Sequence, residues 1–213
     1  MAKKKNNQVY GFVASELDGS EHIFEAPESL ALPEEYDYRN FLSTVLDQGS
    51  SPICVPCSLS TWVNWRINMR DGSKKDHAVK TKEFFRKAGG TTDGMTFKDA
   101  LHYLRHNGIE TDEGNKKIQE YAMIRNHISL RNAIIANGPC VIALPVYDDT
   151  GYKYFWDDSR GYYKGGHAVS VVGWTKEGFI IRNSWGKYFG DWGYVILPYK
   201  DFNKVLEAWT IVR

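Results

Sequence analysis

Two cysteines three residues apart, Cys54 and Cys57, are the strongest candidates for chemistry in this sequence. Cys54 begins a run of apolar residues at helical spacing, so we expect its thiol to lie at the amino terminus of a helix. Free backbone N–H groups and the helix dipole at such a position favour a thiolate and lower the pKa of the cysteine. One hypothesis for Cys54 is therefore a nucleophile, and the other is a buried structural thiol.

A nucleophilic thiol needs polar partners, and the carboxyl-terminal half of the chain offers them. An imidazole would hold the thiolate and later protonate the leaving amine, and a third polar group would fix the imidazole ring. His167 begins the apolar stretch HAVSVVGW, and Asn183 ends the stretch FIIRN. A hairpin turning near residues 175–178 would return Asn183 to the vicinity of His167. Gln48, six residues before Cys54, could act with a backbone N–H as an oxyanion hole.

The elements that must position these residues form a helical front half and a β-rich back half. Apolar spacing and capping residues predict helices over 54–69, 96–106 and 129–136. Runs of β-branched and aromatic residues predict strands over 141–146, 167–174, 179–182, 193–198 and 205–212. This segregation predicts an α+β fold of two lobes, and a cleft between lobes is a favoured place for a site.

Several segments of the sequence resemble the papain family of cysteine peptidases. The matching segments are Asp37-Tyr38-Arg39, QGSSPIC around Cys54, TDGMT at 92–96, GHAVSVVGW around His167 and IRNSWGKYFGDWGY around Asn183. The resemblance covers residues 32–213 and implies a papain-like catalytic domain with an active site between its lobes. The implied left lobe is helical, about 42–130, and the right lobe is β-barrel-like, about 131–213 with 32–41. Residues 1–31 would form a partly ordered amino-terminal extension.

The resemblance also implies a role for individual residues. The chain would be a cysteine endopeptidase that hydrolyses peptide bonds through a thioester on Cys54, with His167 as base and acid, Asn183 as its orienter and Gln48 in the oxyanion hole. The spacing from Gln48 selects Cys54 over Cys57, which we expect in the core. Positions implied to bind substrate are Asp93, Gly94, Met95, Thr96, Gly165, Gly166, Ala168, Trp185 and Glu207.

Glu207 is placed in the substrate pocket only by a loose count from the carboxyl terminus. It alternates with apolar residues on one strand face, so its carboxylate needs either a partner or an exit to solvent. The exit to solvent is the preferred interpretation. The alternative is that Glu207 allows the pocket to accept Arg or Lys.

The sequence departs from the family pattern at several positions. Ser51 stands where many members carry a disulfide cysteine, Val55 and Pro56 replace a Trp and a small residue, and Gly166 stands where plant members often carry Asp. The 31 residues before Leu32 are shorter than the usual inhibitory prosegment. We therefore expect either that the chain starts after processing or that activity is controlled in another way.

Other functions remain open at this point. The segment CVPC also fits a thiol oxidoreductase, but the βαβ context of that fold is missing. A catalytically inactive peptide-binding protein of the same fold, and an acyl transferase or peptide ligase using the same thioester, are the nearer alternatives. His102 and His106 could share a metal, but no third ligand is indicated, so we expect no metal and no cofactor.

Composition narrows the class of protein further. Seven Trp, 13 Tyr and 10 Phe indicate a globular chain, and 27 basic against 26 acidic residues give no field that attracts nucleic acid. No apolar run approaches the length of a membrane span, and no apolar region follows the basic start as a secretory signal requires. Three cysteines favour a reducing, cytoplasmic-type compartment. The expected partners are a peptide or protein substrate and a possible protein inhibitor, and we expect a monomer.

Overall fold

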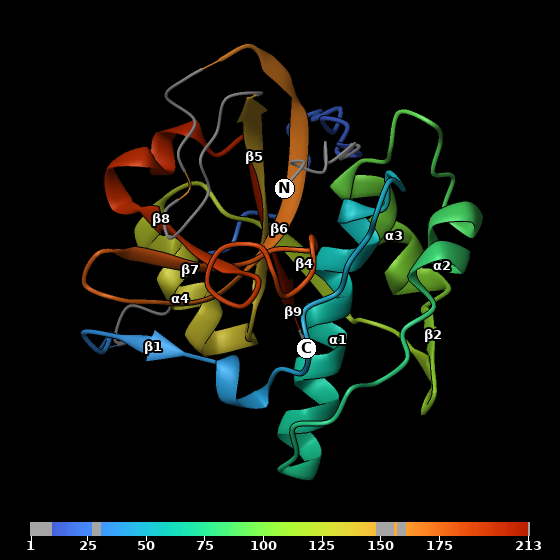
Figure 1. Cartoon of the computed structure of the whole chain (residues 1–213), viewed down its shortest axis with the longest axis horizontal. Coiled ribbons are helices and arrows are strands. Elements are labelled where there is room, and N and C mark those ends of the chain that lie inside the picture. Colours follow the sequence, from blue (N-terminus) through green and yellow to red (C-terminus); the bar gives the residue numbers. More distant parts are fainter. Residues whose placement is uncertain (1–9, 27–30, 148–155, 157–160, 213) are drawn as a thin grey trace, which may run out of the picture.

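A seven-stranded antiparallel sheet dominates the computed structural model, which describes residues 10–26, 31–147, 156 and 161–212. The strand order is β4-β9-β5-β6-β7-β8, and β1 pairs with β6 (Figure 1). The strands are β1 (Tyr36–Asp37), β4 (Glu120–Met123), β5 (Cys140–Tyr147), β6 (Tyr163–Trp174), β7 (Gly178–Arg182), β8 (Tyr194–Pro198) and β9 (Glu207–Val212). Helix α4 (His127–Asn137) packs against the sheet through β9, β6 and β5.

The remaining helices lie beside this sheet, with α1 in direct contact with β6 (Figure 1). They are α1 (Cys54–Asp71), α2 (Thr81–Lys87) and α3 (Phe97–His106), next to a hairpin of β2 (Ile109–Thr111) and β3 (Gly114–Lys116). Two short 3₁₀ helices are η1 (Arg39–Phe41) and η2 (Tyr199–Lys204). The α+β prediction is confirmed. Within the described part of the chain, no helix has both the length and the apolar character needed to cross a membrane.

The three predicted helices and five predicted strands all form, with ends shifted by a few residues. At α3, the Thr96 hydroxyl accepts a hydrogen bond from the Asp99 N–H at 2.9 Å, as the capping pattern predicts. The elements that were not predicted from the sequence are short: α2, β1, β2, β3, β4 and the 3₁₀ helices η1 and η2. Strand β4 lies within the range predicted for the helical lobe, yet it pairs with β9 at the edge of the large sheet.

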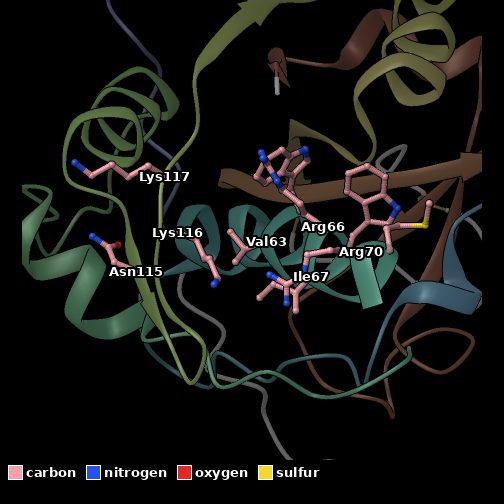
Figure 2. A pocket seen from close by; sticks show the side chains of 10 residues that line it. Val63, Arg66, Ile67, Arg70, Asn115, Lys116 and Lys117 are labelled. Atoms are coloured by element: carbon pink, nitrogen blue, oxygen red, sulfur yellow. The ribbon is translucent and has the colours of Figure 1, made fainter. Parts of the chain in front are cut away.

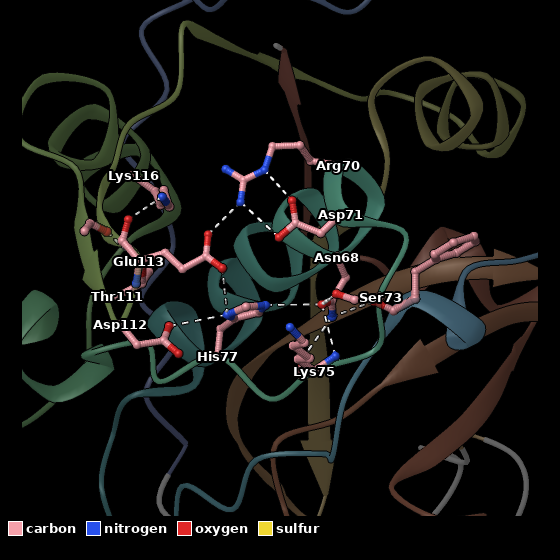
Figure 3. Close-up of polar contacts among 12 residues, drawn as sticks. Asn68, Arg70, Asp71, Ser73, Lys75, His77, Thr111, Asp112, Glu113 and Lys116 are labelled. Carbon is pink, nitrogen blue, oxygen red and sulfur yellow. Dashed lines mark hydrogen bonds and ion pairs between the residues drawn. The ribbon is translucent and has the colours of Figure 1, made fainter.

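A hydrogen-bond network around Asn68 fixes the carboxyl-terminal end of α1 (Figure 3). The fully buried Asn68 amide donates to Phe41 O at 3.2 Å and Lys75 O at 3.0 Å. Its Oδ1 atom contacts Ser73 Oγ at 2.7 Å, the Lys75 N–H at 3.1 Å and His77 Nε2 at 3.2 Å. These contacts hold the loop after α1 and thereby the direction of the helix that carries Cys54 at its other end.

Candidate active site

His167 and Asn183 are brought together by the β6–β7 hairpin, as the sequence analysis expects. His167 lies on β6, Asn183 follows β7, and the chain turns between them with a Thr175 N–H to Gly178 O hydrogen bond of 2.8 Å. The His167 Nε2 atom lies 2.7 Å from Asn183 Oδ1, and both residues are buried. Asn183 Oδ1 also accepts the Ser184 N–H at 2.7 Å. Because an amide oxygen only accepts, the neutral ring carries its proton on Nε2 and leaves Nδ1 free to act as a base.

The other polar atoms of this pair have no such partners. Among the described residues, neither His167 Nδ1 nor Asn183 Nδ2 has a hydrogen-bond partner. Burial lowers the pKa of His167 to about 4, and the hydrogen bond with Asn183 only partly offsets this effect. The imidazole is therefore neutral near pH 7 in this structure.

Cys54 is the first residue of α1 and is fully buried. Burial raises the pKa of its thiol to about 11, although hydrogen bonds from backbone N–H groups, chiefly that of Ala168, act in the opposite direction. The expectation of a lowered pKa is therefore wrong for this state, because desolvation outweighs the helix terminus. The Cys57 thiol is also buried, as expected for a core residue, and burial raises its pKa as well.

Gln48 lies six residues before Cys54 in a buried position that is fixed by Ser184. Its Oε1 atom accepts the Ser184 hydroxyl at 2.5 Å, and its Nε2 atom donates to Ser51 O at 3.0 Å. The Gln48 N–H also donates to Ser184 O at 2.8 Å. Ser184 thus orients both Gln48 and Asn183, a role for which the spacing in the sequence gives no signal.

Aromatic rings surround the His167 imidazole. The Trp185 ring stacks on it with centroids 4.5 Å apart. Trp156 lies nearly parallel to the imidazole at 6.4 Å, and Tyr10 meets it edge-on at 6.4 Å. No motif in the sequence marks Trp156 or Tyr10 as part of this site.

Tyr10 belongs to a segment, residues 10–15, that crosses the site; we call it the strap. It bonds to both sides of the cleft: the Phe12 N–H donates to Gly166 O at 3.3 Å, and the Val13 N–H donates to Met95 O at 3.1 Å. The Met95 N–H donates in turn to Gly11 O at 3.0 Å. Phe12 therefore runs antiparallel to Gly166 and parallel to Met95. The amino-terminal extension is short, but it occupies the backbone groups of Met95 and Gly166, two of the predicted substrate-binding residues.

The strap fits closely because two glycines remove side chains at its contacts. A β-carbon at Gly11 would overlap the backbone of Pro52, two residues before Cys54. A β-carbon at Gly94, whose φ is +116°, would overlap the backbone of Gly11. The Phe12 side chain is 7% exposed and lies 5.4 Å from the Phe97 ring.

Glu207 anchors the end of the strap. Its two carboxylate oxygens accept the Ser15 N–H at 2.5 Å and the Ser15 hydroxyl at 2.8 Å, and Trp209 Nε1 donates to it at 2.9 Å. Glu207 is only 6% exposed. The preferred interpretation, an exit to solvent, is therefore wrong: the carboxylate is buried and finds partners in Ser15 and Trp209.

The predicted substrate-binding residues divide into those that meet the strap and those that do not. Gly94, Met95, Gly165, Gly166 and Glu207 meet it directly. Ala168 is buried beside Cys54, while Asp93 is exposed in a turn and Thr96 caps α3. Trp185 also meets the strap, because its ring centroid lies 6.2 Å from that of Tyr10.

Two hollows of the structure are lined by residues outside the strap. One of about 520 Å³ lies along the carboxyl-terminal half of α1 and next to β3, with Arg66, Arg70 and Lys116 among its lining residues (Figure 2). The other, of about 610 Å³, is lined by residues that include Thr44 and Trp192. Neither contains Cys54 or His167. Among the described residues, no group of three or more His, Cys, Asp or Glu side chains could hold a metal ion.

A family model described as papain family cysteine protease matches residues 66–206. The chain belongs to the papain family of cysteine proteases. The matched range contains His167 and Asn183 but begins after Gln48 and Cys54.

Named relatives and solved structures agree with this assignment. A cathepsin B-like CP2 from Giardia intestinalis is 29% identical over 80% of this chain and 68% of its own length. A gut-specific cysteine proteinase from Caenorhabditis elegans is 37% identical over 36% of this chain, and a cathepsin L-like proteinase from Fasciola hepatica is 24% identical over 78%. This chain spans 25% and 60% of the lengths of these two relatives.

The solved structures show the same papain-like fold over nearly the whole chain. Xylellain, a cysteine protease from Xylella fastidiosa, superimposes with a TM-score of 0.81 at 21% identity over 100% of this chain and 98% of that one. The proCathepsin B S9 of Trypanosoma congolense gives a TM-score of 0.81 at 17% identity over 97% and 86% of the two chains.

Proposed function

We propose that this protein is a cysteine endopeptidase with Cys54 as nucleophile and His167 as base. The observation that carries the proposal is the His167–Asn183 hydrogen bond of 2.7 Å, which leaves Nδ1 unprotonated in a site shared with a thiol at a helix start. Asn183 orients the ring, and Trp185 shields the hydrogen bond between them.

The proposed reaction has two stages. In the first, His167 Nδ1 takes the Cys54 proton and the sulfur attacks the carbonyl carbon of the scissile peptide bond. The Cys54 N–H and the Gln48 amide stabilise the resulting oxyanion. The C–N bond then breaks as His167 gives its proton to the leaving amine. In the second stage His167 takes a proton from water and the hydroxide attacks the thioester carbonyl. The C–S bond then breaks as His167 returns its proton to the sulfur, which restores the thiol and releases the carboxylic acid product.

The strap keeps this machinery closed. Its backbone uses the hydrogen-bonding groups of Met95 and Gly166, and its Tyr10 and Phe12 side chains cover His167 and fill the neighbouring pocket. A substrate that binds these same groups therefore requires the strap to leave. Departure of the strap would also return water to His167 and Cys54 and remove the burial that holds both groups neutral.

The test uses a full-length protein in which the strap cannot seat. Gly11→Val places a side chain against the Pro52 backbone, so the variant should hydrolyse a fluorogenic peptide much faster than the parent chain does. In this background, Cys54→Ala should abolish turnover, while Cys57→Ala should retain it. Turnover that survives Cys54→Ala but is lost in Cys57→Ala would contradict the assignment.

The pocket filled by Phe12 sets the expected substrate preference. Phe12 packs beside Met95 and Phe97, which favours an apolar or aromatic substrate side chain there. Glu207, once released from Ser15, would be available to an Arg or Lys side chain. Comparing cleavage of peptides with Arg or Leu at this position, in the Gly11→Val protein and in its Glu207→Gln derivative, tests this. An unchanged ratio would count against contact with Glu207.

A further inference from the structure

A tight turn beyond the catalytic residues carries an unexpected side chain. Asp191 and Tyr194 exchange both backbone hydrogen bonds, at 2.8 and 3.0 Å, so Trp192 and Gly193 are the two central residues of the turn. Their φ angles are +54° and +90°. Positive φ at both central positions is typical of a type I′ turn, for which Asn-Gly is the preferred pair. Among the described residues, Trp192 alone combines a side chain with positive φ.

Burial does not compensate for this strained backbone. The Trp192 side chain is 72% exposed, and Tyr188 on the same loop is 91% exposed. Asn or Gly at position 192 would adopt the positive φ with less strain. Because most of Trp192 is exposed, either substitution would remove little buried surface. Trp192 therefore does not serve the folding of the turn. Strained residues with exposed aromatic side chains are typical of binding surfaces.

Trp192 lies at the rim of the hollow of about 610 Å³. The hollow offers hydroxyl and amide groups from Asn40, Ser43 and Thr44, together with the cations Arg39, Lys74 and Lys187. Arg39 is paired with Asp37 at 2.8 Å. Hydrogen-bonding groups in the hollow beside an exposed indole suit an extended polypeptide, which offers both backbone polar groups and apolar side chains.

The residues that line the hollow are connected to the active site along the chain and through ring contacts. Arg182 donates to the carbonyls of Ser43 and Thr44 at 2.8 Å each, and these residues lead directly to Gln48. On the other side, Phe189 packs edge-on against Trp185 at 4.9 Å, and Trp185 stacks on His167. A protein chain held at Trp192 therefore lies on the loop that also shields the catalytic imidazole.

We propose that Trp192, Tyr188 and the adjoining hollow form an exosite that binds an unfolded segment of a protein substrate outside the catalytic cleft. That the bound segment belongs to a substrate rests on the proposed peptidase function. Its physical basis is independent of catalysis, because none of these residues touches the reacting groups. Short peptides that fill only the cleft would not reach the exosite.

The first test measures binding without turnover. The full-length Cys54→Ser protein and its Trp192→Asn derivative are titrated with reduced, carboxymethylated lactalbumin as an unfolded probe. We expect Trp192→Asn to weaken binding about tenfold or more. Because Asn-Gly relieves the left-handed strain, the Tm should rise by about 2 to 4 °C. Ile128→Asn removes another exposed apolar side chain, on α4, and should leave binding unchanged.

The second test uses the Gly11→Val background. Trp192→Asn should raise KM for the unfolded protein and leave kcat and the hydrolysis of a short peptide unchanged. Three results would each overturn the exosite. The first is that Trp192→Asn binds the unfolded probe as tightly as its parent, and the second is that Ile128→Asn weakens binding as much as Trp192→Asn does. The third is that Trp192→Asn changes the oligomeric state and not the binding of the probe. If Gly11→Val hydrolyses nothing, the peptidase proposal fails, while the binding experiment still decides whether the surface binds unfolded chains.

Discussion

Two buried asparagines show how differently this fold treats polar groups. Asn68 lies near the carboxyl-terminal end of α1, and Asn183 lies beside His167, in the site reached by the amino-terminal end of the same helix. Both are less than 5% exposed. Asn68 uses both amide hydrogens and accepts contacts from three further groups, whereas Asn183 uses only its oxygen.

The difference separates a structural role from a chemical one. A fully satisfied buried amide fixes the chain around it, and its removal leaves several buried groups without partners. Unsatisfied buried groups such as Asn183 Nδ2 and His167 Nδ1 stabilise little in the closed state. Their hydrogen-bonding capacity is available to substrate, water or the thiol once the strap leaves.

The largest effect on stability should come from Asn68→Ala. The substitution removes five hydrogen bonds that join α1 to Phe41 and to the loop after the helix, so we expect a loss of about 3 kcal/mol in the free energy of unfolding. Urea denaturation measures it. Peptide hydrolysis in the Gly11→Val background should change by less than about twofold at a temperature where both proteins are folded. A large fall in kcat with unchanged stability would contradict the structural role.

A similar effect should follow from acidification, through His167. Its pKa is lowered to about 4 in the fold from an ordinary 6.5, so the unfolded chain binds the proton first as the pH falls. The stability that His167 contributes is present above about pH 6.5 and is lost as the pH falls toward 4, by about 3 kcal/mol in total. Unfolding curves of the Cys54→Ser protein between these pH values measure the loss. His167→Gln should remove most of the pH dependence in this window.

Asn183→Ala should affect chemistry more than stability. Without Asn183 Oδ1, the His167 ring loses the contact that fixes its tautomer, so kcat for a peptide in the Gly11→Val background should fall about 10²-fold. The free energy of unfolding should fall by only about 1 kcal/mol, because two hydrogen bonds are lost and not five. If Asn183→Ala destabilised the protein as much as Asn68→Ala, the contrast between the two asparagines would not hold.

Local signals in the sequence were sufficient for the long elements and for the pairing of His167 with Asn183. Helix α1 and strands β6 and β7 have strong periodicity, and the hairpin geometry follows from the turn between them. The strap could not be predicted in the same way. Tyr10, Phe12 and Ala14 stand at every second position, which suits an extended segment but does not indicate its partners. Those partners are backbone groups of Met95 and Gly166, more than 80 residues away.

The pKa of Cys54 and the partners of Glu207 also depend on residues that are distant in the sequence. A helix start predicts a lowered pKa for Cys54, but the value in the fold depends on whether water reaches the sulfur, and the strap decides this. Glu207 shows the same dependence on distant partners. Its alternation with apolar neighbours indicates burial, yet only the structure shows that Ser15 approaches its carboxylate.

The smallest predicted effect concerns this last contact. Ser15→Ala removes the hydroxyl that donates to Glu207 at 2.8 Å while keeping the backbone N–H bond, so the closed state should weaken by about 1 kcal/mol. The strap would then open about fivefold more often, and iodoacetamide should alkylate Cys54 faster by the same factor, since the thiol reacts only when it is uncovered. Val13→Ala alters an exposed side chain of the strap and should not change the rate. Equal rates for Ser15→Ala and the parent would mean that the backbone bonds to Met95 and Gly166 hold the strap without help from Glu207.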